Sequence, residues 1–170
     1  MMRRALAAAL LAVLAGTSLL AGRDSGQAVY TCGTVPGIVK PAGGRLNTWN
    51  LSALGFSPGS PSAKPLLIRY KSITRLEYGR SPPSRAETRE MPVIPCVHLK
   101  RLANYLTIFY EEVPADERKD RKDQKDLKKK EHYAVFDLGD RALRPTLRIL
   151  ESRSGKRIKY QDAGARKAAR

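Results

Sequence analysis

The sequence has few of the side chains that most often carry out catalysis or bind metals. Its 170 residues include two histidines, two cysteines and one tryptophan. The histidines, His98 and His132, lie in different expected elements, and we expect no nucleophile paired with a base. A structural zinc site takes four suitably spaced ligands, mostly Cys and His, which this chain does not provide. We therefore predict no enzyme activity, no metal site and no cofactor.

The sequence is also short of acidic residues. It has 16 Asp and Glu against 32 Lys and Arg, which gives a formal net charge of +16. Such an excess of positive charge favours anionic partners, such as lipid headgroups, acidic glycans or nucleic acid. It carries no information about the fold.

Long hydrophobic runs are absent after the first 22 residues. The chain begins with Arg3 and Arg4, followed by an apolar run and then by small residues. This order is typical of a signal peptide, and an ordinary buried helix is the alternative. We predict a signal peptide at residues 1–28, cleaved near Gly26 or Ala28 or at an earlier point, and hence export to the periplasm or the medium. The run is too short and too rich in alanine for a membrane span, so we expect no transmembrane segment in the mature chain.

Removal of the signal peptide leaves about 140 residues, enough for one domain with a modest core. We predict a flexible leader at 29–39, a folded domain at 40–162 and a basic tail at 163–170. In an oxidising compartment the two cysteines, Cys32 and Cys96, can form a disulfide. Two unpaired, buried thiols are the alternative.

Alternating apolar residues predict several short strands in the folded domain. The stretch Leu66–Arg80 changes register in its middle, which predicts two strands joined by a tight turn or by one helical turn. The other predicted strands are Arg45–Trp49, Ala53–Ser57, Tyr105–Glu112 and His132–Leu138.

One amphipathic helix is predicted at about residues 141–154. Leu143, Leu147 and Leu150 recur at i, i+4 and i+7, so they form one apolar stripe. Gly155 is placed to end the helix in a left-handed cap. An isolated helix of this length is marginal in water, so the stripe is expected to cover the strands.

Two connecting segments differ in composition from the strands. Residues 80–103 contain prolines within a short apolar stretch. We interpret this segment as a loop folded against the end of a barrel formed by the strands, or as an element that inserts into a surface. Residues 114–131 contain almost no large apolar side chain and form a charged insertion at the tip of a hairpin. This insertion is either disordered or a polyelectrolyte arm.

Several segments resemble small exported bacterial proteins with a PH-like (pleckstrin-homology-like) domain, whose role is uncharacterised. The segments are IRYKSITRLEYGR, YLTIFYEE and HYAVFDLG followed by RPTLRILESRSGKRIKYQD. The shared positions are Tyr70, Ile73, Leu76, Tyr78, Gly79, Leu150, Glu151, Arg153, Ser154, Gly155 and Lys156. The resemblance covers roughly residues 40–162. It implies a mainly β fold, a bent antiparallel sheet or partly open barrel capped by one C-terminal helix.

The resemblance implies binding through loops, with Lys and Arg as charge partners. We expect a non-enzymatic exported binding or scaffold module that engages anionic lipid, an envelope glycan or a protein partner in the cell envelope. A basic nucleic-acid-binding protein is the alternative, although the signal peptide argues against it and no aromatic stacking platform accompanies the basic runs. The candidate contact residues are Arg80, Lys100, Arg101, Lys128, Lys129 and Lys130.

Overall fold

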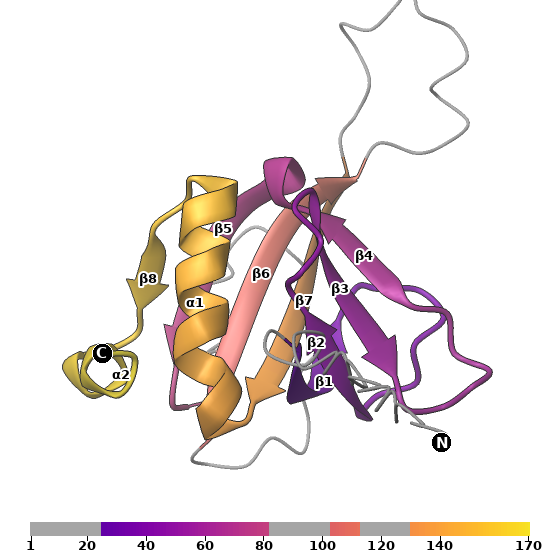
Figure 1. Ribbon diagram of the computed structural model, residues 1–170, viewed down its shortest axis with the longest axis horizontal. Helices are drawn as coiled ribbons and strands as arrows, with labels where there is room; N and C mark the ends of the chain where they lie inside the picture. The colour runs from indigo at the N-terminus through magenta and orange to yellow at the C-terminus, as the bar shows by residue number, and fades with distance from the viewer. Residues whose placement is uncertain (1–24, 82–102, 113–129) are drawn as a thin grey trace, which may run out of the picture.

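The computed structural model describes residues 25–81, 103–112 and 130–170 (Figure 1). The first half of the chain forms β1 (Ser25–Gly33), β2 (Ala42–Asn47), β3 (Ala53–Pro58), β4 (Leu66–Arg69), the single 3-10 turn η1 (Tyr70–Ser72) and β5 (Ile73–Gly79). The second half forms β6 (Tyr105–Glu112), β7 (Lys130–Leu138), α1 (Asp140–Ser154), β8 (Ile158–Tyr160) and α2 (Ala163–Ala168).

The strands form one eight-stranded sheet that curls into a half-barrel (Figure 1). Its order is β4-β3-β2-β1-β7-β6-β5-β8. All neighbours run antiparallel except β5 and β8, which are parallel. The register shifts between Tyr30 and Cys32 in β1 and between Ile73 and Arg75 in β5. Such shifts bend a strand, and they help the sheet to curl.

Side chains on the concave side of the sheet form the main core. Tyr30, Phe56 and Phe136 come from three different strands, and their ring centroids lie 5.2–6.3 Å apart. All three are fully buried. A smaller buried cluster lies on the opposite side of the sheet, because neighbouring residues of a strand point to opposite faces. Its members are Cys32, Tyr105, Phe109, Tyr133 and Val135.

Helix α1 confirms the helix predicted at about residues 141–154. The predicted leucine stripe, Leu143, Leu147 and Leu150, is buried in the main core. Figure 1 shows α1 lying across the sheet in front of β5 and β6. The helix ends at Gly155, whose φ of 68° is the left-handed conformation that glycine adopts without steric cost. The predicted bent sheet capped by a helix is therefore the observed architecture.

The strand predictions are confirmed in type and differ at their ends. Leu66–Arg80 does contain two strands, β4 and β5, joined by the one helical turn η1. The two predicted strands before them correspond to β2 and β3, and β6 and β7 pair along their full length as the expected hairpin. The charged tip of that hairpin, apart from its last two residues, lies outside the described residues.

The expected flexible leader at 29–39 needs correction. Its first part belongs to β1, which lies in the middle of the sheet between β2 and β7. Ala28 and Tyr30 of this strand are buried. Gly26 approaches α1 so closely that an added Cβ would lie 2.1 Å from the Cβ of Ala142. One of the two strands that pair with this segment, β7, is distant in sequence, and composition alone did not reveal the pairing.

The expected basic tail at 163–170 also needs correction, as does the expectation of one C-terminal helix. Residues 163–168 form α2, which is capped by Asp162, whose carboxylate accepts from the amide of Ala165 at 2.7 Å. Ala165 is fully buried. Before α2, β8 joins the sheet beside β5. The C-terminal segment is thus part of the folded unit.

Candidate functional site

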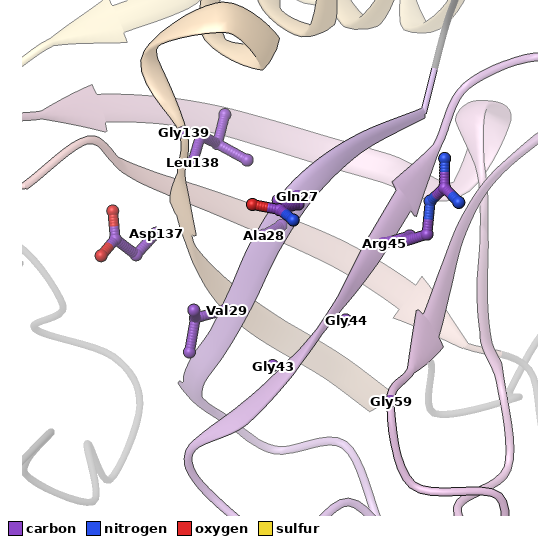
Figure 2. Close-up of a pocket in the computed structure, with 10 residues that line it drawn as sticks. All are labelled: Gln27, Ala28, Val29, Gly43, Gly44, Arg45, Gly59, Asp137, Leu138 and Gly139. Carbon is purple, nitrogen blue, oxygen red and sulfur yellow. The ribbon is translucent and has the colours of Figure 1, made fainter. Parts of the chain in front are cut away.

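A hollow of about 710 Å³ lies on the outer side of β2, β1 and β7 (Figure 2). Gln27 and Arg45 are neighbours across β1 and β2, and Val29 lies between Gly43 and Asp137 in the next row of the sheet. An added Cβ on Gly43 would meet nothing within 4 Å, so the space above this glycine is open. The full lining is Gln27, Ala28, Val29, Gly43, Gly44, Arg45, Gly59, Asp137, Leu138 and Gly139.

The polar groups of this hollow do not converge on one point. Figure 2 shows Asp137 and Arg45 on opposite sides of Gln27. The Oδ1 atom of Asp137 accepts a hydrogen bond from the amide of Asn104 at 3.3 Å, so this carboxylate has a structural role. A small-molecule site usually combines an enclosed apolar cavity with a few convergent polar groups. This open depression does not have that arrangement.

The outer side of α1 carries a row of arginines. Arg141, Arg144 and Arg148 are exposed and recur at i, i+3 and i+7, the spacing that places side chains on one face of a helix. Lys156 and Arg157 follow immediately after the helix and are also exposed. We call these five residues the α1 basic face.

A second hollow, of about 460 Å³, lies at the C-terminal end of this face. Three cationic side chains, those of Arg148, Lys156 and Arg157, line it together with Glu151, Ser152 and Gly155. The Oε1 atom of Glu151 accepts a hydrogen bond from the amide of Ile158 at 2.9 Å and so fixes the start of β8. The hollow is therefore predominantly cationic.

The C-terminal segment has few acids to offset these cations. Residues 140–170 contain ten Lys and Arg and three Asp and Glu. Each of the three acids accepts a hydrogen bond within the fold: Asp140 from the side-chain amide of Asn104 at 2.7 Å, Glu151 from Ile158, and Asp162 from Ala165. The acids hold the elements in place, while the cations of the α1 basic face extend into solvent.

Asn104, which immediately precedes β6, joins three elements of the fold at the N-terminal end of α1. Its side-chain oxygen accepts from the hydroxyl of Tyr78 at 2.7 Å, and its NH2 group donates to the carbonyl of Leu138 at 3.2 Å as well as to Asp140. Burial raises the pKa of Tyr78, which keeps this hydroxyl a donor. These contacts fix the helix on the sheet, so the arginine row has a defined position.

The residues predicted as anionic contacts are only partly within the described chain. Arg80 and Lys130 are both exposed, and they lie at opposite ends of β6, because Gly79 pairs with Tyr105 and Lys130 with Glu112. The structure does not bring these two together. The other predicted contacts, Lys100, Arg101, Lys128 and Lys129, lie outside the described residues.

Cys32 is disulfide-bonded and almost fully buried. Its predicted partner, Cys96, lies outside the described residues, so the pairing stays a prediction. His132 is also buried; its Nδ1 lies 3.1 Å from the hydroxyl of Thr34, and its ring stacks on Tyr110 at 5.6 Å between centroids. The other histidine, His98, lies outside the described residues. Across residues 25–81, 103–112 and 130–170, no three His, Cys, Asp or Glu side chains lie close enough together to hold a metal ion.

The arginine row on α1 was missed at the sequence level although its signal was present. The leucine spacing of this helix and consecutive cations such as Lys128–Lys130 are the more conspicuous patterns in the sequence. The spacing of Arg141, Arg144 and Arg148 would have revealed the row once the buried side of the helix was assigned.

No protein-family model matches the chain, and no curated protein is significantly similar to it. Among the helices that the structure describes, none has the length and apolar composition needed to cross a membrane.

Proposed function

We propose that this protein is a non-enzymatic, exported binding module of the PH-like type that engages an anionic surface in the cell envelope. The α1 basic face is its contact surface. One observation carries the proposal: Arg141, Arg144 and Arg148 are exposed on a single helix face, and every acid of the surrounding segment is already hydrogen-bonded within the fold.

The physical basis is the potential of a concentrated set of cations. Each Lys or Arg close to an anionic membrane contributes about 1 kcal/mol at low salt, and salt reduces this within a Debye length of about 8–10 Å. A row of arginines held on a rigid helix adds these contributions without the entropic cost of ordering a flexible segment. The half-barrel with a helix across its concave side supports the PH-like assignment at the level of architecture.

The proposal is tested by vesicle co-sedimentation with an Arg144→Gln/Arg148→Gln variant. Removing two cations from the α1 basic face should weaken binding to vesicles rich in phosphatidylglycerol about thirtyfold at low salt, and much less at high salt. The unfolding midpoint should be unchanged, because both side chains are exposed.

The matched control is Lys64→Gln/Lys167→Gln, which removes the same charge from exposed positions in the β3–β4 connection and in α2. This control should weaken binding by only a fewfold. An equal loss in both variants would show that net charge, and not the α1 basic face, drives association.

Nucleic-acid binding is the competing function, and charge alone supports it. The same protein should be titrated with DNA and with vesicles over a range of salt. Affinity for DNA that falls steeply with salt, together with indifference to the anionic lipid content of vesicles, would favour the competing function.

A further inference from the structure

The turn between β2 and β3 exposes two large apolar side chains. Trp49 is 69% exposed and Leu51 is 80% exposed, although single exposed apolar residues are common on protein surfaces. These two are only two residues apart, at the tip of one turn. Trp49 is also the one tryptophan of the chain.

The turn is held rigidly, so the exposure of its side chains is built into the fold. The side chain of Asn47 accepts from the amide of Trp49 at 3.1 Å, and the side chain of Asn50 accepts from the amides of Ser52 and Ala53 at 2.8 and 3.2 Å. These bonds satisfy the backbone of the turn locally and leave the Trp49 and Leu51 side chains directed outward.

Arg153, in the last turn of α1, fixes the same turn from the other side. Its guanidinium donates to the carbonyls of Thr48 and Asn50, the latter at 2.8 Å, and lies 5.5 Å from the centre of the Tyr70 ring. The cation that anchors the turn is thus fully engaged. The β2–β3 turn, η1 and the C-terminal end of α1 lie together at the upper end of the molecule in Figure 1.

Exposed cations surround this apolar tip. Tyr70 donates its amide to the carbonyl of Ser52 in the turn at 3.0 Å, and its sequence neighbours Arg69 and Lys71 are both exposed. On the other side, Arg153 is followed by the exposed Lys156 and Arg157. A protruding tryptophan and leucine rimmed by Lys and Arg match the two zones of a membrane surface, where aromatic rings prefer the interface and cations meet anionic headgroups.

We propose that this end of the molecule is a membrane-insertion edge, in which Trp49 and Leu51 enter the interface of a bilayer that contains anionic lipid. This inference rests on the proposed function and selects lipid from among the anionic surfaces it allows. A site for a discrete ligand is usually concave, with a few convergent polar groups, whereas this turn exposes an aromatic and an aliphatic side chain. The α1 basic face ends at the same place, so both surfaces can meet one bilayer.

The fluorescence of Trp49 tests the inference directly, because no other tryptophan contributes to it. When vesicles of phosphatidylglycerol and phosphatidylcholine are added, the emission should shift to shorter wavelength. Lipids brominated on their acyl chains should quench it. In co-sedimentation, Trp49→Ala/Leu51→Ala should weaken vesicle binding about tenfold or more. This fold-change should be nearly the same at low and at high salt, because salt does not screen the apolar contribution.

Val39→Ala is the matched control. Val39 is 85% exposed, and it precedes β2, so it lies at the opposite end of that strand from the turn. It should bind vesicles as the parent does, and all variants should keep the parent unfolding midpoint.

The outcomes separate the two proposals. Vesicle binding that depends on Arg144 and Arg148, with no spectral shift, no quenching and no effect of the double apolar variant, would overturn the insertion edge and leave the proposed function in place. Binding only to an acidic polysaccharide would overturn the insertion edge as well. An absence of binding to any anionic surface at low salt would overturn the proposed function itself.

Discussion

At the residue scale, Tyr30 shows how burial controls the ionisation of a side chain in this fold. Its ring packs against Phe56 and Phe136 and is fully buried. Burial raises the pKa of Tyr30 from 10.0 to about 12, because the phenolate is poorly solvated in the core. The unfolded chain therefore releases this proton at a lower pH than the folded chain does.

This difference predicts a loss of stability at alkaline pH. Below pH 10 the phenol is protonated in both states and contributes no pH dependence; between pH 10 and 12 the unfolded state binds fewer protons, so the free energy of unfolding falls. Denaturant melts at each pH should show that the free energy of unfolding falls less steeply with pH for Tyr30→Phe than for the parent. Deprotonation of lysines affects both proteins alike. Identical slopes in the two proteins would contradict the prediction.

At the scale of the element, the two sides of α1 have different roles. Its leucine stripe closes the concave side of the half-barrel, and its arginines face solvent. The same helix also positions the β2–β3 turn through Arg153. The position of every proposed contact surface therefore depends on how firmly the leucines hold this helix.

Shortening the stripe should cost stability. Leu147→Ala and Leu150→Ala should each lower the free energy of unfolding by about 2–5 kcal/mol, because each leaves a cavity in a packed core. Ser152→Ala, on the exposed side of the same helix, serves as the control. It should change the free energy of unfolding by less than about 0.5 kcal/mol. Near-zero losses for both leucines in denaturant melts would mean that the helix does not close the barrel.

At the scale of the whole molecule, the first strand of the described chain lies in the middle of the sheet and the last strand lies at its edge. β1 pairs with β2 from Ser25 onward and with β7 from Ala28 onward. Cleavage of a signal peptide after Gly26 or Ala28 would therefore remove part of a central strand. Any cleavage that leaves β1 intact must fall before Ser25.

We predict that a chain beginning at residue 25 is more stable than one beginning at residue 29, by about 2 kcal/mol or more, because the shorter chain loses the buried Ala28 and the contact of Gly26 with α1. Thermal and denaturant melts of the two truncated proteins give the comparison. N-terminal sequencing of exported protein should find a start at or before Ser25. Equal stability of the two chains would show that the beginning of β1 is dispensable.

The sequence by itself determined the elements whose causes are local. Alternation predicted the strands around Leu66–Arg80 and the β6–β7 hairpin, and the leucine spacing with Gly155 predicted α1 and its end. Periodicity and capping act within one turn or one strand, so they can be read without knowing the fold. The excess of positive charge was equally evident, and with it the expectation of an anionic partner.

Only the tertiary structure decided which segments pair and which cations gather on one surface. The β1 segment has mixed composition and became a central strand because β2, the next strand along the chain, and β7, which is distant in sequence, supply its hydrogen-bond partners on either side. The rim around Trp49 likewise combines the β2–β3 turn, η1 and the end of α1, joined by Arg153 across about a hundred residues of sequence. Contacts of this kind depend on the closing of the sheet around the helix. No local pattern encodes them.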